Sequence, residues 1–332
     1  MASAATPRHD KPHLLQCLLE AVQTSDWRCF VADSNHPFGL RLFRSEQPAI
    51  PLRVYIWNCT PGGKHRSPDE FRIQFTGAWP TPHADEVTLL LGWHDGYKVF
   101  VGWSVGHHAK QKGKSPSAQI KEGTLQAAAD KSFSTQVKTN GQVVVAFQPQ
   151  FFVEYALSAE RIHGTVLTKP ELKLLDDVAH ADADAIAAIP DETRRLIVAR
   201  IARRYRTYNF RRRVLTAYRH RCAFCGVQLN LLDAAHILPV AAPASTDETS
   251  NGIALCKLHH AAFDGNLVSF DALYKVEVSK HGASQLLADK RAQGLTEFTA
   301  MLKATIILPV DIKDRPVPAQ ITAARSIRRW VP

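Results

Sequence analysis

Two tetrapeptides decide the fold of the C-terminal part of the chain: Cys222-Ala-Phe-Cys225 and, further along, Cys256-Lys-Leu-His259. Each places two soft ligands on one tight turn, and four such ligands hold a tetrahedral Zn²⁺ ion. Because four protein ligands leave no open position for a substrate, we expect a structural zinc site. The alternative is that these cysteines are buried apolar thiols. Cys17, Cys29 and Cys59 have no partner pattern and are expected in the core.

A second set of polar residues is threaded through the same segment. Asp233-Ala-Ala-His236 lies between the two halves, Asn251 precedes Cys256, and His260 directly follows His259. Residues 219–225, 233–237 and 251–264 together resemble the HNH nuclease motif, in the cysteine-framed form found in McrA-like restriction endonucleases. The resemblance covers about 60 of the 332 residues.

The resemblance implies a ββα-metal fold, in which two strands and a helix surround a metal, and it implies roles for three residues. His236, at the end of the first strand, would take the proton of the attacking water. Asn251 would fix the loop backbone and so the ring of His236. His260, near the start of the helix, would hold a catalytic Mg²⁺ or Mn²⁺ ion, which stabilises the charge on the phosphate and the leaving oxygen.

One position departs from the family pattern. Many members have an Asp or His directly before the general base, where it binds the catalytic metal, but here that position is Ala235. Asp233 lies two positions earlier, on the same strand face. Asp264 lies four residues after His260, on the same helical face. We expect Asp264 or Asp233 to complete the metal site, with Asp264 preferred. The alternatives are a helix-end role for Asp264 and a loss of activity through the change at Ala235.

The net charge of +10 is concentrated in one block. Between Arg194 and Arg221 there are 11 arginines and no Lys, Asp or Glu, which leaves 30 basic and 31 acidic residues elsewhere. Apolar residues recur there at three- and four-residue steps, so we expect one or two amphipathic helices. Arginine suits bidentate contact with phosphate, although a solvated helix face is the alternative. The residues predicted to bind DNA are Arg203, Arg204, Arg206, Arg211, Arg212 and Arg213.

The chain is expected to divide into three parts of an α+β protein. Residues 1–165 contain runs rich in Val, Ile and aromatic residues, broken by Gly and Pro, which predict a β-rich domain with one helix over 117–130. Residues 166–193 are acidic and alanine-rich and predict a helical linker. Residues 194–332 hold the arginine helices and the zinc-stabilised HNH domain, with its core in 216–270 and a C-terminal extension. In that extension we expect a helix over 283–302 and a strand over 304–310.

The N-terminal domain has the size and place of a DNA or modified-base recognition domain, and it resembles, without a defining motif, the β-barrel reader domains of restriction enzymes. The basic loop with Lys110, Lys112 and Lys114 is predicted to contact DNA, with a solvated turn as the alternative. An aromatic residue could stack on a flipped base, although most of the tryptophans are expected in the core. These tryptophans are Trp57, Trp79, Trp93 and Trp103.

Together these features predict a metal-dependent endonuclease of restriction type that cleaves double-stranded DNA, with or without modified bases. A non-catalytic zinc-stabilised DNA-binding protein and an RNA-cleaving toxin or defence nuclease are the alternatives. A single HNH site cuts one strand, so a double-strand break implies a homodimer or two sequential nicks. With no long apolar run and no signal-like N-terminus, a cytoplasmic protein outside the membrane is expected.

Overall fold

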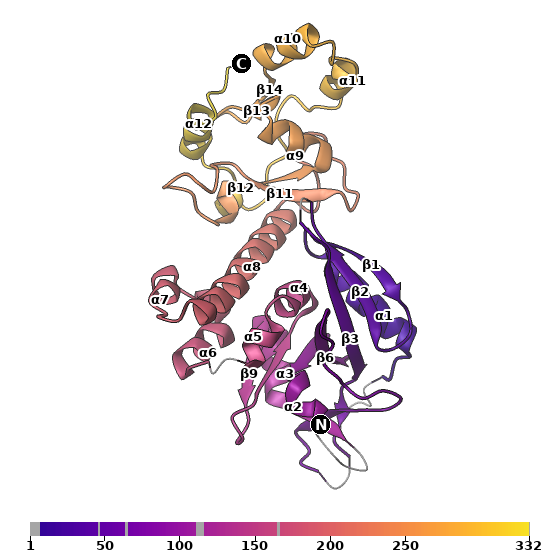
Figure 1. The fold of residues 1–332 in the computed structure, drawn as a ribbon. Helices are drawn as coiled ribbons and strands as arrows, with labels where there is room; N and C mark the ends of the chain where they lie inside the picture. Colours follow the sequence, from indigo (N-terminus) through magenta and orange to yellow (C-terminus); the bar gives the residue numbers. More distant parts are fainter. Residues whose placement is uncertain (1–6, 46, 64–65, 111–115, 165–166, 332) are drawn as a thin grey trace. The chain divides into compact units, whose positions relative to one another are not determined.

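The computed structural model describes residues 7–45, 47–63, 66–110, 116–164 and 167–331, and the chain forms two compact units (Figure 1). The first is Met1–Tyr205 and the second is Arg206–Pro332. The division falls within one long helix, α8 (Glu192–Ala217), where the sequence predicted one or two arginine-rich helices. Helices and sheets are mixed in both units, which confirms the α+β class. None of the described helices is both long and apolar enough to cross a membrane.

The first unit is built on a seven-stranded sheet in the order β1-β2-β3-β6-β7-β10-β9. Neighbouring strands are antiparallel except β3 and β6, which are parallel. In the described part of the chain β1 and β9 do not pair with each other, so the sheet is open and the expected β-barrel is not formed. The strands are β1 (Arg28–Asp33), β2 (Phe38–Phe43), β3 (Ile50–Asn58), β6 (Val87–His94), β7 (Val99–Trp103), β9 (Phe133–Val137) and β10 (Val143–Phe147).

A smaller antiparallel sheet, in the order β4-β5-β8, and a set of short helices complete the first unit. Residues 117–130, expected as one helix, form strand β8 followed by α3, because the first five residues pair with β5. The elements are β4 (Thr60–Pro61), β5 (Glu70–Gln74), β8 (Ser117–Lys121), α1 (Lys11–Gln23), α2 (Val105–Ala109), α3 (Glu122–Lys131), η1 (Pro149–Phe151), α4 (Phe152–Ala156) and α5 (Ala159–Gly164).

The acidic segment expected as a linker is helical, but it packs into the first unit. It forms α6 (Lys169–Asp176), η2 (Val178–His180) and α7 (Ala183–Ala187). Leu172, Leu175 and Ile186 are buried in the same cluster as the sheet residues. The apolar residues of this segment therefore anchor it, and the division between the units lies further along the chain.

The second unit contains the two strands and the helix that the resemblance implies. Strand β11 (Leu232–His236) pairs antiparallel with β12 (Gly252–Cys256), and α9 (Lys257–Asp264) follows at once. Gly252 allows β12 to pack closely on α8, because a Cβ atom there would lie 2.2 Å from Val214 Cγ2. The remaining elements are η3 (Thr249–Asn251), β13 (Val268–Phe270), β14 (Val276–Val278), α10 (Lys280–Ala288), α11 (Leu295–Ala300), η4 (Ile312–Asp314) and α12 (Pro318–Ile327).

The C-terminal extension differs from its sequence-based prediction in two places. The helix expected over 283–302 is two helices, α10 and α11, and Gly294 with φ of 88° begins the second. A left-handed residue interrupts a helix, and glycine adopts that conformation without steric cost. The strand expected over 304–310 is reduced to one bridge between Lys275 and Thr305.

Candidate metal and catalytic site

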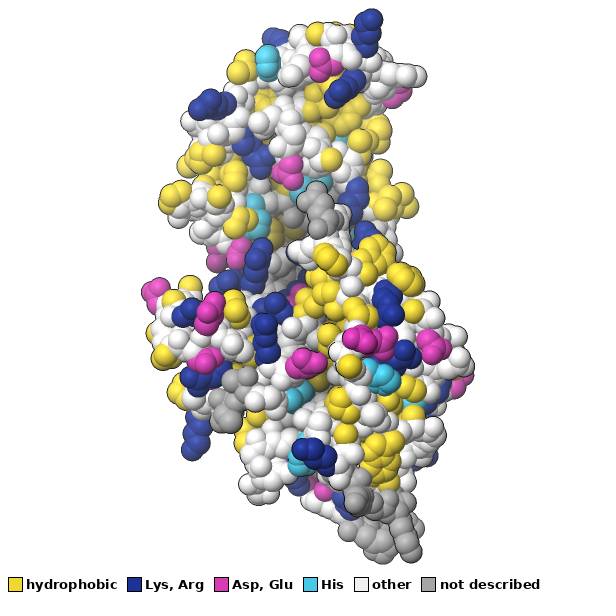
Figure 2. All heavy atoms as spheres, in the orientation of Figure 1, with side chains coloured by type: hydrophobic (Ala, Val, Ile, Leu, Met, Phe, Trp, Pro, Cys, Tyr) yellow, Lys and Arg dark blue, Asp and Glu magenta, His cyan; other side chains and the backbone are white. Residues whose placement is uncertain are grey.

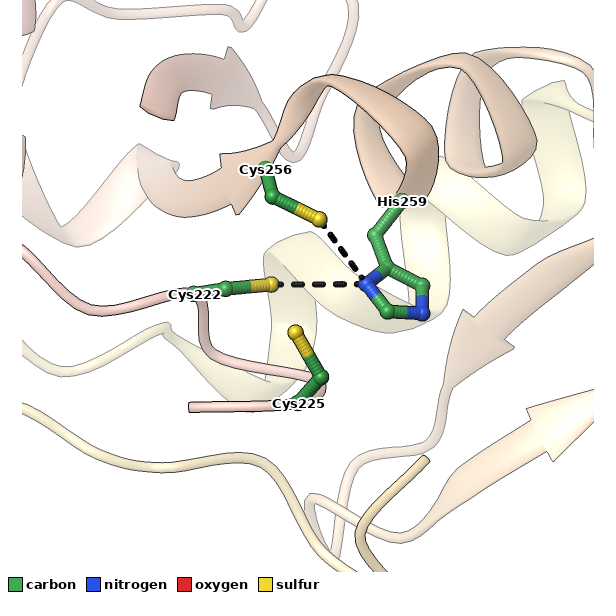
Figure 3. Close-up of side chains that lie close together, drawn as sticks. All are labelled: Cys222, Cys225, Cys256 and His259. Atoms are coloured by element: carbon green, nitrogen blue, oxygen red, sulfur yellow. Dashed lines mark hydrogen bonds between the residues drawn. The ribbon is translucent and has the colours of Figure 1, made fainter. Parts of the chain in front are cut away.

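The four predicted zinc ligands meet in the interior of the second unit (Figure 3). The ligand atoms of Cys222, Cys225, Cys256 and His259 all lie within 4.8 Å of one another. His259 Nδ1 is 3.1 Å from Cys256 Sγ and 3.6 Å from Cys222 Sγ. Zinc–ligand bonds of about 2.0–2.3 Å place tetrahedral ligand atoms roughly 3.3–3.8 Å apart, so the cluster fits one zinc ion.

Local backbone geometry explains why these residues converge. The Cys222 carbonyl accepts a hydrogen bond from Gly226 N at 2.8 Å, and Gly226 has φ of 83°, so the chain turns sharply around the first two thiols. Cys256 caps the N-terminus of α9, and His259 lies in the first turn of that helix. Phe224 and Phe298 flank the His259 ring and keep it from water. The cluster is thereby closed, as in a structural site.

His236 lies at the end of β11, where its imidazole is held from two sides. The ring stacks on Phe210 of α8 with centroids 3.9 Å apart and an interplanar angle of 8°. Its Nε2 is 3.0 Å from Asp247 Oδ1. An ionised carboxylate only accepts hydrogen bonds, so the ring donates through Nε2 and keeps its lone pair on Nδ1. With 19% of the side chain exposed, the ring is oriented and still reachable by water.

Asn251 is fully buried beside the loop that carries Asp247. Its Oδ1 accepts from Leu238 N at 2.9 Å, and its Nδ2 donates to the Thr246 carbonyl at 2.9 Å. Nδ2 also lies 3.3 Å from Ser245 Oγ. The amide thus ties both ends of the segment 238–246 together, and this segment connects His236 to its carboxylate partner.

The His260 ring lies between the two candidate carboxylates, one at each nitrogen. Nδ1 is 3.5 Å from Asp233 Oδ2, and Nε2 is 3.2 Å from Asp264 Oδ2. Asp233 also pairs with Lys257 and, at 3.5 Å, with Arg211. The hydrogen bond from His260, followed by the one from Lys257, holds the pKa of the Asp233 carboxyl well below its usual range despite partial burial. Asp264 is more open, with 58% of its side chain exposed.

These catalytic candidates do not form a tight ligand cluster of the kind that the zinc residues form. Within the described ranges, the other group of close metal-binding atoms is His9, His13 and Asp95 in the first unit. There the two imidazole rings stack face to face at 3.8 Å, and Asp95 also pairs with Lys98. That group therefore resembles a hydrogen-bonded surface network.

The arginines of α8 fall into two groups, one that holds the fold and one that faces solvent. Arg204 donates to the carbonyls of Gln150 and Thr24, Arg211 to the carbonyl of Leu232 at 2.8 Å, and Arg213 to that of Asp247. Arg203, Arg206 and Arg212 are exposed. Lys and Arg side chains gather on the surface where α8 runs in Figure 1 (Figure 2).

In the first unit, three of the four candidate tryptophans are core residues, since Trp57, Trp93 and Trp103 are at most 6% exposed. Trp79 is partly exposed. A polar pocket of about 290 Å³ is lined by Trp57, Arg8, Asn58, Arg72 and Gln74, among others. Of the lysine loop, Lys110 caps α2, whereas Lys112 and Lys114 lie outside the described residues.

Three residues of the site were not predicted from the sequence: Asp247, Phe210 and Arg328. Asp247 lies in a loop without a motif, and its only signal is its position eleven residues after His236. Phe210 lies within the arginine block, where it was interpreted as one of many apolar helix residues. Arg328 lies in the basic C-terminal tail, far along the chain from every motif residue, and its Nη2 is 3.5 Å from the His236 carbonyl.

Two family models match the chain, one in each unit. Residues 50–156 match the family "Methylase-associated X1" and residues 222–271 match the family "HNH endonuclease". Among solved structures, a modification dependent TagI restriction endonuclease is similar at a TM-score of 0.30 and 12% identity, over 98% of this chain and 93% of that chain. No curated protein matches significantly. Residues 222–271 of the second unit thus match the HNH endonuclease family, as the motif residues indicated.

Proposed function

We propose that the protein is a metal-dependent HNH endonuclease of restriction type that hydrolyses phosphodiester bonds in double-stranded DNA. The observation that carries this proposal is the arrangement around His236, which is stacked on Phe210, hydrogen-bonded to Asp247 through Nε2, and accessible to water. A histidine with a purely structural role needs no carboxylate partner on the solvent-facing side of its ring. A general base does, because the carboxylate fixes the tautomer and stabilises the protonated ring.

In this reaction His236 takes a proton from water at Nδ1, and the resulting hydroxide attacks the phosphorus. The bond between the phosphorus and the 3′-oxygen breaks, and this oxygen takes up a proton from solvent, which gives a 5′-phosphate and a 3′-hydroxyl end. Asp247 stabilises the imidazolium that forms, and Phe210 prevents the ring from rotating out of line. Asn251 acts one step further away, because it holds the loop on which Asp247 is carried.

His260 and Asp264 are proposed to hold the catalytic Mg²⁺ or Mn²⁺ ion, with Asp233 behind them. When bound, the ion supplies positive charge to the phosphate and to the leaving oxygen. A histidine that ligates a metal through one nitrogen donates its other N–H to a carboxylate, and Asp233 is placed for this at Nδ1. Because Lys257 and Arg211 already neutralise Asp233, Asp264 is the better ligand, as the sequence spacing favoured.

Zinc at the cysteine cluster is proposed to have a structural role, and the exposed arginines are proposed to bind the DNA backbone. The zinc ligands cap the start of α9 and so position the helix that carries His260. Arg203, Arg206 and Arg212 offer cationic groups to phosphates, whereas Arg204, Arg211 and Arg213 are proposed to act mainly by supporting the fold.

The first unit is proposed to recognise the target, as a specific sequence or a modified base. The match of residues 50–156 to a family described as methylase-associated supports a function alongside a methylase. The pocket beside Trp57, about 290 Å³ in volume and lined by two arginines and two amide side chains, offers hydrogen bonds of the kind a nucleotide needs. A homodimer, or two sequential nicks, would account for cleavage of both strands.

Cleavage of plasmid DNA by the zinc-loaded protein, with and without Mg²⁺ or Mn²⁺, tests the proposal. We expect metal-dependent cleavage that His236→Ala abolishes and Asp247→Asn strongly slows, with DNA binding retained in both variants. Unmodified, methylated and hydroxymethylated substrates, together with an RNA of the same sequence, define the target. Cleavage by His236→Ala at the wild-type rate would refute the assignment of the base, and binding without cleavage by the wild type would favour a DNA-binding protein.

A further inference from the structure

The side chain of Arg328, just beyond α12, reaches the centre of the proposed active site, although it lies near the end of the chain. Its Nη1 donates to the Phe263 carbonyl at 3.0 Å, and its Nη2 is 3.5 Å from the His236 carbonyl. The same Nη1 is 3.6 Å from Asp264 Oδ1. The guanidinium also lies over the Phe263 ring, 4.4 Å from its centroid.

Arg328 is more deeply buried than an arginine in an ordinary surface ion pair. Only 14% of its side chain is exposed, and its Nε is buried without a hydrogen-bond partner among the described residues. Burying a guanidinium carries a large desolvation free energy, and an ion pair with the solvent-exposed carboxylate of Asp264 offsets little of it. Its two carbonyl contacts instead join the end of β11 to the end of α9.

These two ends carry the two halves of the proposed active site. The β11 end bears the general base His236, and the α9 end bears Asp264, one turn after His260. The contact is reciprocal, since Asn266, directly after α9, donates through Nδ2 to the Arg328 carbonyl at 3.0 Å. The segment around Arg328 and the end of α9 thus fix each other's position.

We propose that Arg328 is a positioning residue of the nuclease: it sets the separation between His236 and the His260–Asp264 metal pair. The proposal rests on the function proposed above. Arginine is needed because its planar fork presents several N–H groups in fixed directions. A lysine at this position would keep the charge but would not hold the Phe263 and His236 carbonyls in one fixed geometry.

The test compares Arg328→Ala and Arg328→Lys with Arg325→Ala. Arg325 lies one turn earlier on α12, is also largely buried, and pairs with Glu277 at 2.7 Å, outside the catalytic set. Mn²⁺ affinity of the zinc-loaded, DNA-free proteins is measured by electron paramagnetic resonance. Single-turnover cleavage at saturating Mn²⁺ and the dissociation constant for DNA are measured on the same preparations.

The direction in which the Mn²⁺ affinity changes distinguishes a geometric role of Arg328 from a purely electrostatic one. Removing a positive charge beside Asp264 would by itself tighten cation binding. In Arg328→Ala we expect the opposite, weaker Mn²⁺ binding or slower cleavage by about 10–100-fold, the usual effect of losing an outer-sphere support of a metal ligand. Arg328→Lys keeps the charge, so a similar loss in that variant reports the geometry alone. DNA affinity should stay near the wild-type value, and Arg325→Ala should change neither quantity.

Each outcome decides for or against the proposal. Tighter or unchanged Mn²⁺ binding with wild-type cleavage in Arg328→Lys would overturn it, as would equal effects of Arg325→Ala and Arg328→Ala. A wild-type protein that binds no Mn²⁺ would overturn it too. If Arg328→Ala does not fold, Arg328→Lys decides. Weakened Mn²⁺ binding in a protein that cleaves no nucleic acid would support the positioning role and refute the proposed function.

Discussion

Replacement of Asn251 by alanine tests the loop architecture most directly, because this side chain is fully buried and holds both ends of the 238–246 segment. The change removes the acceptor of the Leu238 N–H and the donor to the Thr246 carbonyl. No atom of alanine reaches either group. We expect the loop to open far more often and to release Asp247 from His236.

The magnitude follows from the groups left without partners. A buried donor or acceptor that loses its partner costs about 1–3 kcal/mol, and two such groups, one of them only partly buried, give roughly 2–4 kcal/mol. At 1.4 kcal/mol per factor of ten, the opening equilibrium of the loop should rise by roughly 30- to 1,000-fold. That is a large share of the ~5–15 kcal/mol by which a domain is stable.

Hydrogen exchange followed by mass spectrometry, on peptides covering residues 237–248, measures this effect at the site itself. Asn230→Ala, an exposed position in the same unit, is the matched control. We expect faster exchange at the Leu238 amide and a much slower cleavage rate in the Asn251 variant, with zinc retained. Wild-type protection in that peptide would refute the argument that the amide holds the loop.

Three further perturbations have defined outcomes. Elemental analysis should find about one bound zinc per chain. The variant Cys222→Ser should lose this zinc, whereas Cys17→Ser should retain it. In EDTA-containing buffer, Arg206→Ala should reduce the slope of log binding constant against log salt by about 1, whereas Arg194→Ala, which removes an ion pair within the first unit, should not. Burial lowers the pKa of His163 to about 4. Between pH 6.5 and 4 the unfolded chain therefore takes up a proton at His163 that the folded chain does not. The free energy of unfolding should then fall as the pH falls, by about 2 kcal/mol at pH 5. The variant His163→Gln should flatten this pH dependence.

The sequence predicted the centre of the second unit well, because metal ligands and strand–helix order are local properties. The zinc residues come in two short pairs, and each pair is shaped by one turn, so their convergence requires only that β12 and α9 follow each other. His236, Asn251 and His260 are then carried on the same short elements. Their chemical roles remain proposals.

The features that the sequence did not predict depend on contacts between distant segments. Phe210 meets His236 only because α8 packs on β12 at Gly252, and Arg328 arrives from the end of the chain. The barrel expectation was wrong because a run of strands does not reveal whether the first and last strands pair. The acidic segment 166–193 was predicted as a linker from its charge, but its buried leucines and isoleucines determine its position.

Two adjacent histidines on α9 connect the proposed zinc site with the proposed cleavage site. Successive residues of an α-helix point about 100° apart, so His259 faces the interior cysteines while His260 faces the carboxylates at the surface. One peptide bond therefore separates a ligand of the proposed structural zinc from a ligand of the proposed catalytic metal. On the proposed roles, oxidation of a zinc-binding thiol or a shortage of zinc would inactivate the cleavage site without chemically modifying any catalytic residue. On these proposed roles, the zinc supply of the cell would set an upper limit on the fraction of chains able to cut.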